Sequence, residues 1–152
     1  MNVLLIGLGS MGLNHLRILK LLVKKENILI YDKNKLILKK YLSEHSKTQT
    51  TNLEDLIKLA DKIIIATSTN THFQLIKKCL KFKKYKIFIE KPLVNKISHA
   101  KNLEIILKKN RSKIFVGLIE RFNSSIVSLK KYVSNKRIFN IDINRSARVS
   151  KR

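Results

Sequence analysis

The sequence has few of the residues that staple small extracellular domains or hold metal ions. Its 152 residues include one cysteine, one proline and no tryptophan. A single cysteine excludes an internal disulfide and a multi-cysteine metal site, and we expect Cys79 to be a small buried residue on a helix. No two of the four histidines combine metal-ligand spacing with a carboxylate on a shared face. We therefore expect no metal site.

Long hydrophobic runs and targeting signals are also lacking. Hydrophobic residues make up 44% of the chain, which is enough for a sizeable core. Their runs have the length of strands and are interrupted by polar residues or glycine, so none predicts a transmembrane span. The first ten residues lack the basic region and cleavage site of a signal peptide. The default expectation is a cytoplasmic protein of ordinary domain size, with no membrane partner.

Acidic residues are scarce: there are 10, against 33 lysines and arginines, and the formal net charge is +23. Basic surfaces bind nucleic acids through their phosphates. The excess here is mostly lysine, spread through nearly every expected helix, and no base-reading motif accompanies it. Lysine, isoleucine and asparagine have AT-rich codons, so genome composition alone could produce this charge. A nucleic-acid binder is therefore the third of three alternatives.

Short apolar runs alternate with amphipathic stretches of helical length. The runs are rich in Ile and Val and apolar on successive residues, as in strands covered on both faces. They occupy residues 2–7, 28–32, 62–67, 86–91 and 113–118. Apolar spacings of three and four predict helices at residues 11–25, 33–45, 52–61, 70–82 and 95–109. This alternation predicts an α/β fold, a doubly wound parallel sheet with helices on both faces.

The ends of these elements carry further signals. Asn52 or Thr51 is suited to cap the helix expected from residue 52, and Asn70 or Thr71 the next one. The last segment, residues 137–152, predicts a strand that begins and then passes into a basic tail. We expect one domain over residues 1–136, followed by a tail or the start of a further domain over 137–152.

Three glycines form the pattern G-x-G-x-x-G directly after the first expected strand and at the start of a helix, the context that favours a dinucleotide site. Gly7 permits a tight turn, Gly9 lets the backbone approach a pyrophosphate, and Gly12 lets helix and strand pack closely. The helix begins at Ser10 and Met11, where free N–H groups and a partial positive charge suit phosphates. The turn therefore predicts a nucleotide cradle.

The next strand ends in an acidic residue. Asp32 stands where a carboxylate accepts hydrogen bonds from a ribose 2′-hydroxyl, and it would repel a 2′-phosphate. This position favours NAD over NADP as the cofactor. Lys33 and Lys35 lie nearby and leave NADP possible.

Further landmarks follow the later strands, whose carboxyl ends line the ligand crevice of open parallel sheets. They are ATSTNTHF at 66–73, EKPL at 90–93 and VGLIERFNSS at 116–125. Together with GLGSMGLNH at 7–15, they resemble the N-terminal half of the Gfo/Idh/MocA oxidoreductases, the family of glucose–fructose oxidoreductase and inositol dehydrogenase. The resemblance covers nearly the whole chain and implies a Rossmann-like dinucleotide-binding domain.

The resemblance also implies roles for individual residues. Lys91 would lie against the nicotinamide and the reacting carbon of the substrate, as the catalytic residue that eases proton movement. Glu90 would help fix the nicotinamide ribose, and Arg121 would lie near the mouth of the site. The loop residues expected to contact the cofactor are Thr67, Ser68, Asn70 and His72. His15, on the first helix, is assigned only to packing or solvent.

Departures from the family pattern are also visible. Serine stands at Ser68 and Ser124, where the family commonly carries proline. The family's second, α+β domain supplies an antiparallel sheet, the substrate pocket, the usual oligomer interface and an aspartate–histidine pair, and this chain ends about where that domain would begin. We therefore expect a naturally truncated chain or one piece of a split enzyme, with a homo-oligomer or a separate chain supplying the missing domain.

The function expected is that of the NAD(P)-binding domain of an oxidoreductase. The resemblance implies hydride transfer between nicotinamide and a hydroxyl carbon of a sugar, polyol or nucleotide sugar. The alternative is a non-catalytic NAD-binding or interaction module, a remnant whose apolar strand near residues 137–143 would pair with another chain.

Overall fold

The computed structural model describes residues 1–45 and 50–144. The chain divides into two compact units, Met1–Leu118 and a second unit that begins at Ile119. The first unit ends two residues after the last strand of the sheet. The domain boundary expected at residue 136 stays a prediction.

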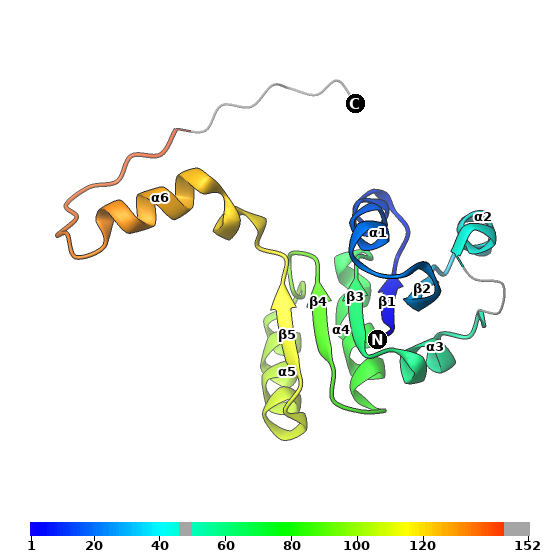
Figure 1. Ribbon diagram of the computed structural model, residues 1–152. Helices are drawn as coiled ribbons and strands as arrows, with labels where there is room; N and C mark the ends of the chain where they lie inside the picture. The colour runs from blue at the N-terminus through cyan, green and yellow to red at the C-terminus, as the bar shows by residue number, and fades with distance from the viewer. Residues whose placement is uncertain (46–49, 145–152) are drawn as a thin grey trace. The chain divides into compact units, whose positions relative to one another are not determined.

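One parallel sheet forms the centre of the first unit (Figure 1). Its strands within the described residues are β1 (Val3–Ile6), β2 (Ile28–Tyr31), β3 (Lys62–Ile65), β4 (Lys86–Ile89) and β5 (Lys113–Val116). They stand in the order β2-β1-β3-β4-β5, and every neighbouring pair is parallel. Each strand lies inside a run that the sequence predicts as a strand, so the predicted parallel sheet is confirmed.

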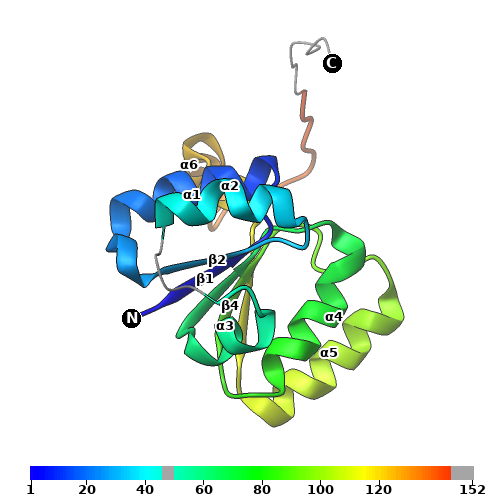
Figure 2. The same cartoon turned by 90° about the vertical axis from the view of Figure 1, so that its right-hand side faces the viewer.

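Helices cover both faces of this sheet. They are α1 (Ser10–Leu22), α2 (Lys35–His45), α3 (Leu53–Leu59), α4 (Thr69–Leu80) and α5 (Ile97–Asn110), with a short 3₁₀ turn η1 (Lys25–Asn27) before β2. The two views agree that α1 and α2 lie on one face and α3, α4 and α5 on the other (Figures 1 and 2). The doubly wound architecture is therefore confirmed.

The core has two halves, one on each face of the sheet. Successive strand residues point to opposite faces, so Leu4 packs with the α3–α5 side while Leu5 packs with α1 and α2. All four residues of β1 are buried. Burying one such side chain completely contributes about 1.5–3 kcal/mol. Two buried faces explain why β1 is apolar at every position and shows no alternation.

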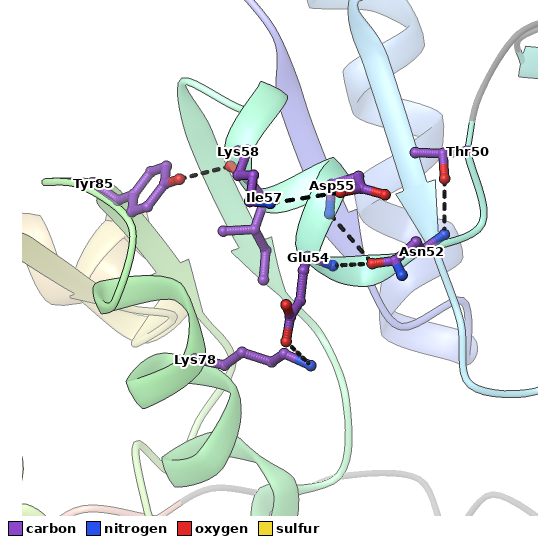
Figure 3. A network of polar contacts seen from close by, with 8 residues as sticks. All are labelled: Thr50, Asn52, Glu54, Asp55, Ile57, Lys58, Lys78 and Tyr85. Atoms are coloured by element: carbon purple, nitrogen blue, oxygen red, sulfur yellow. Dashed lines mark hydrogen bonds and ion pairs between the residues drawn. The ribbon is translucent and has the colours of Figure 1, made fainter.

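Capping of α3 follows the prediction (Figure 3). The side chain of Asn52 accepts hydrogen bonds from the N–H groups of Glu54 at 2.8 Å and Asp55 at 3.4 Å, so Asn52 is the cap rather than Thr51. Figure 3 also shows the ion pair between Lys78 of α4 and Glu54 of α3, whose Nζ and Oε1 atoms lie 3.0 Å apart. This ion pair links α3 to α4.

The predicted cap of α4 is wrong. The helix begins at Thr69, with Ser68 as an N-cap whose side chain makes no capping hydrogen bond. The predicted caps Asn70 and Thr71 lie inside the first turn, where the Asn70 side chain accepts from the Ser68 hydroxyl and the Thr71 hydroxyl donates to the Ser68 carbonyl. Short polar side chains satisfy such local bonds as readily within a turn as before it.

The second unit contains a 3₁₀ turn η2 (Ile119–Phe122) and a helix α6 (Ser124–Val133) that the sequence analysis did not anticipate. Asn123 caps α6 by accepting from the Ser125 N–H at 3.0 Å. The strand predicted from residue 137 is not formed within residues 137–144, where Phe139 is 89% exposed. A strand needs a neighbour for its backbone bonds, and none of the described strands pairs with this segment. The basic tail at 145–152 lies outside the described residues.

Three lysines stand side by side at the starts of β3, β4 and β5. Lys62 pairs in register with Lys86, and Lys86 with Lys113, and all three are exposed. Like charges directly opposite each other on neighbouring strands are unfavourable. The end of the sheet remote from the strands' carboxyl ends therefore carries a row of positive charge. Among the described helices, none is both long enough and apolar enough to cross a bilayer.

Candidate functional site

A cleft of about 340 Å³ opens at the carboxyl ends of β1, β2 and β3. In the strand order, β2 lies on one side of β1 and β3 on the other. This reversal is the point at which open α/β sheets bind ligands. The residues that line the cleft are Ile6, Gly7, Gly9, Tyr31, Asp32, Lys33, Leu53, Ala66, Thr67, Ser68, Thr71 and Leu75.

Gly7 and Gly12 are required by the packing of the protein itself, whether or not a ligand is bound. Gly7 has a φ of +98°, and its N–H donates to the Tyr31 carbonyl at 2.8 Å. A Cβ on Gly7 would lie 2.6 Å from the Ala66 carbonyl oxygen, and one on Gly12 would lie 1.9 Å from the Gly7 oxygen. Neither position has room for a side chain. Gly7 and Gly12 therefore serve the close approach of β1, α1 and the loop after β3.

Gly9 differs from its two neighbours in the motif. Its backbone is extended, with φ −70° and ψ −172°, and a Cβ there would meet no atom within 4 Å. Gly9 is also the N-cap of α1 and has no side chain to accept from the first-turn N–H groups. Gly9 lines the cleft, and the space beside it is open where α1 begins, an arrangement that suits an anionic group of a ligand.

Asp32 is held from two sides at the end of β2. One carboxylate oxygen accepts from the Leu8 N–H at 2.8 Å, and the other from the Asn34 N–H at 2.8 Å. Each oxygen has a further lone pair that can accept a hydroxyl hydrogen. The carboxylate lines the cleft beside Lys33. Its orientation is therefore fixed before any ligand arrives.

The loop after β3 is shaped by its own hydroxyl groups. The Thr71 hydroxyl donates to the Ser68 carbonyl at 2.8 Å and lies 2.7 Å from the Thr67 hydroxyl. Since Thr71 has one hydroxyl hydrogen, Thr67 is the donor in that second bond. Thr67 and Ser68 line the cleft, whereas Asn70 is exposed and is not part of its lining.

The Glu-Lys-Pro segment follows β4, the next strand along the sheet. Glu90 is buried, its N–H donates to the Ile65 carbonyl at 3.0 Å, and its Oε1 lies 2.7 Å from Nε2 of His15. Lys91 is exposed, and the Lys91–Pro92 peptide bond is cis. Neither Glu90 nor Lys91 lines the cleft described above.

His72, in the first turn of α4, is fully buried. Its Nδ1 lies 3.1 Å from the Pro92 carbonyl oxygen and 3.2 Å from that of Leu93, and its Nε2 lies 3.0 Å from the Thr67 oxygen. The ring thus stands between the loop after β3 and the segment after β4. It contacts the backbone of both.

The remaining predicted residues lie elsewhere. Ser10 and Met11 are exposed on the first turn of α1. Arg121 is exposed in η2, which belongs to the second unit, so its place near the mouth of the site stays a prediction. In the described part of the chain, no group of three or more His, Cys, Asp and Glu residues is placed to hold a metal ion.

Sequence reasoning missed several members of this site. The ring of His15 packs edge to face against Phe88 at 5.3 Å, in line with the packing role expected of it, but its pairing with Glu90 was not anticipated. Its position one helical turn after Gly12 is the signal that could have drawn attention to it. Leu53 and Leu75 supply apolar walls from α3 and α4, and their sequence pattern was indistinguishable from that of core residues.

Comparison with known proteins decides the family. A family model described as "Oxidoreductase family, NAD-binding Rossmann fold" matches residues 1–118. The chain belongs to the Gfo/Idh/MocA oxidoreductase family. The match ends at the residue where the first compact unit ends. The resemblance that the four motifs suggested is therefore confirmed, and with it the Rossmann fold.

The sequence and structural similarity of this chain to members of the Gfo/Idh/MocA family can be given in numbers. Myo-inositol 2-dehydrogenase from Thermotoga maritima is 30% identical over an alignment of 145 residues, which covers 89% of this chain and 41% of that protein. The crystal structure of a probable dehydrogenase from the same species has a TM-score of 0.74 at 27% identity, with 89% of this chain and 41% of that chain covered. Scyllo-inositol dehydrogenase from Lactobacillus casei, solved with NAD(H) and scyllo-inositol, has a TM-score of 0.73 at 20% identity, over 88% of this chain and 41% of that chain, and shares the fold.

Proposed function

We propose that this chain is the cofactor-binding part of an NAD(H)-dependent dehydrogenase that acts on a hydroxyl carbon of a sugar, polyol or nucleotide sugar. The observation that carries the proposal is the cleft at the strand reversal, with open space at Gly9 on one wall and the Asp32 carboxylate on another. The substrate class rests on the family and on the inositol dehydrogenases among its members.

The residues of the cleft fit a dinucleotide. The first-turn N–H groups of α1 would donate to the diphosphate, which Gly9 admits close to the backbone. The Asp32 carboxylate would accept from the adenosine ribose hydroxyls, because each oxygen keeps a lone pair beyond its backbone bond. A 2′-phosphate there would meet a fixed negative charge, so we propose NAD in preference to NADP.

The segment after β4 would serve the reacting end. Bound NAD supplies a carbon that accepts hydride from the substrate. Lys91, exposed directly after the strand, would hold the substrate hydroxyl and take up or return its proton through its amine. Glu90, anchored by His15, would accept from the nicotinamide ribose, and Arg121 would lie at the mouth. The chain spans 41% of the length of myo-inositol 2-dehydrogenase, so cofactor binding is the activity proposed for these residues by themselves.

A titration of the purified chain with NADH and NADPH, followed by nicotinamide fluorescence, tests the proposal. We expect saturable NADH binding, stronger than NADPH binding. Gly9→Val fills the open space with a side chain that the extended backbone accepts, so it should abolish binding while the protein stays folded. Lys24→Val is the control, because Lys24 is also exposed and precedes a helical turn, but lies outside the cleft.

Each outcome of the titration decides something definite. Absence of NADH and NADPH binding at millimolar concentration would overturn the proposal. Equal affinity for NADH and NADPH would overturn only the role given to Asp32, and the proposal of a cofactor cleft would stand. Loss of binding in Lys24→Val as well as Gly9→Val would show that the fluorescence change does not report on the cleft.

A further inference from the structure

The segment that carries Lys91 raises a question of rigidity. A group that handles a proton must be held in place, because small displacements of a reacting group cost large factors in rate. Lys91 itself is exposed, and so is Pro92. The position of Lys91 must therefore be set by contacts of its neighbours, which are Glu90 before it and Pro92 and Leu93 after it.

His72 holds the residues after Lys91. The ring is fully buried, and all three of its close polar neighbours are carbonyl oxygens, which accept hydrogen bonds and never donate. An N–H at Nδ1 ties the ring to the Pro92–Leu93 side, and an N–H at Nε2 ties it to Thr67. The imidazolium form ties it to both.

His15 holds the residue before Lys91. Its Nε2 lies 2.7 Å from Oε1 of Glu90, which is buried, and its ring meets Phe88 of β4 edge to face. His15 belongs to α1 and His72 to α4, and these two helices lie on opposite faces of the sheet (Figure 2). The two histidines therefore reach the Glu90–Leu93 segment from opposite sides.

We infer that His72 and His15 are positioning residues that fix Lys91 by clamping its two neighbours. The inference rests on the proposed function for the work that Lys91 does, and on geometry alone for the clamp. Nε2 of His72 also lies 3.0 Å from the carbonyl oxygen of Thr67, and a neutral ring, which has one N–H, donates either there or to the Pro92–Leu93 side. The clamp uses the tautomer with its N–H at Nδ1, in which the ring makes no hydrogen bond to the cleft residue Thr67.

Two measurements separate this role from general stability. Hydrogen exchange of the N–H groups of residues 90, 91, 93 and 94, in the protein without cofactor, reports how firmly the segment is held. Affinities for NADH and for ADP-ribose, which lacks the nicotinamide, report whether the loss is confined to the reacting end. His72→Ala should speed exchange in the segment and weaken NADH binding about five- to tenfold, the effect of a lost hydrogen bond. ADP-ribose binding should stay within about twofold of the wild type.

Matched variants sharpen the test. His72→Asn places an amide where Nδ1 stood, so it should restore part of the NADH affinity and slow the exchange again. His15→Phe keeps the ring against Phe88 and removes the bond to Glu90. It should speed exchange in the same segment and weaken NADH but not ADP-ribose.

The contrary results are equally definite. Equal weakening of NADH and ADP-ribose in the folded variants would overturn the clamp, as would unchanged exchange at residues 90–94 in both His72→Ala and His15→Phe. If His72→Ala fails to fold, His15→Phe and His72→Asn carry the decision. A wild-type chain that binds no NADH would overturn the proposed function, while the exchange measurement would still decide the clamp.

Discussion

The Asp32 carboxylate accepts the N–H of Leu8 at 2.8 Å, and this bond fastens the end of β2 to the glycine turn that follows β1. The other carboxylate oxygen accepts from Asn34. One side chain therefore both builds the turn and presents a negative charge to the cleft. Its two roles call for different substitutions.

Substitutions at Asp32 should separate its hydrogen bonds to the turn from its negative charge at the cleft. Asp32→Asn keeps one acceptor oxygen, so we expect it to lose about 1 kcal/mol of stability and to narrow the preference for NADH over NADPH about tenfold. Asp32→Ala leaves the N–H groups of Leu8 and Asn34 without a side-chain acceptor and should cost about 1–3 kcal/mol. Urea unfolding and fluorescence titration measure the two effects. A full NADH preference in Asp32→Asn would contradict the role of the charge.

The glycines of the turn should respond differently to alanine. A Cβ at Gly12 would meet the Gly7 oxygen at 1.9 Å, so Gly12→Ala should cost about 1–3 kcal/mol or more through overpacking. Gly9→Ala places its methyl group in open space on an extended backbone. It should change stability by about 1 kcal/mol or less, because restriction of the unfolded chain offsets the loss of glycine at the N-cap of α1. Thermal unfolding compares the pair, and equal losses would refute the assignment of Gly9 to ligand approach.

Tyr85 should contribute through a buried hydrogen bond. Its hydroxyl donates to the Ile57 carbonyl at 2.6 Å, which joins the start of β4 to α3 (Figure 3). Tyr85→Phe should cost about 1–3 kcal/mol, because the Ile57 carbonyl then loses its side-chain donor. Tyr132→Phe is the control, since Tyr132 is 69% exposed, and it should change stability by about 0.5 kcal/mol or less. Chemical denaturation of both variants would show whether the difference is present.

Cys79 predicts a loss of stability at alkaline pH. The thiol is fully buried, and burial raises its pKa from 9.0 to about 12. From pH 9 to about 12 the unfolded chain releases the thiol proton while the folded chain retains it, so the thiol's contribution to stability falls as pH rises. The slope is at most about 1.4 kcal/mol per pH unit. Cys79→Ala should show a shallower decline in urea unfolding between about pH 8 and about pH 10. An identical decline would show that the thiol is not responsible.

The strands and most helices were predictable because their pattern is local. A run such as Val3–Ile6 is apolar at every position because both faces of β1 are buried. Helix α6 was missed although its apolar residues Ile126, Leu129 and Val133 stand at the three- and four-residue spacing that predicts a helix. The strand expected near Phe139 shows the reverse case, a pattern present without the element. Alternation gives a segment the capacity to pair, but pairing itself depends on a neighbouring strand.

The candidate site was predictable only in part. The glycine turn and Asp32 could be predicted from the sequence, because a fixed spacing within one βαβ unit brings them together. His15 and Glu90 stand 75 residues apart in the sequence, and their contact depends on β1, β3 and β4 following one another in the strand order. The contacts of His72 go to backbone carbonyl oxygens. Every residue has such an oxygen, so the sequence does not show which residues His72 contacts.

The lysine row at Lys62, Lys86 and Lys113 makes ionic strength part of the fold. Three ammonium groups in adjacent register repel one another least when mobile anions gather around them, within a Debye length of about 8 Å at physiological salt. Dilute buffer thins that atmosphere, so we expect the repulsion between the starts of β3, β4 and β5 to be strongest at low salt. Added salt should therefore stabilise this end of the sheet modestly, because dissolved anions screen the three exposed lysines.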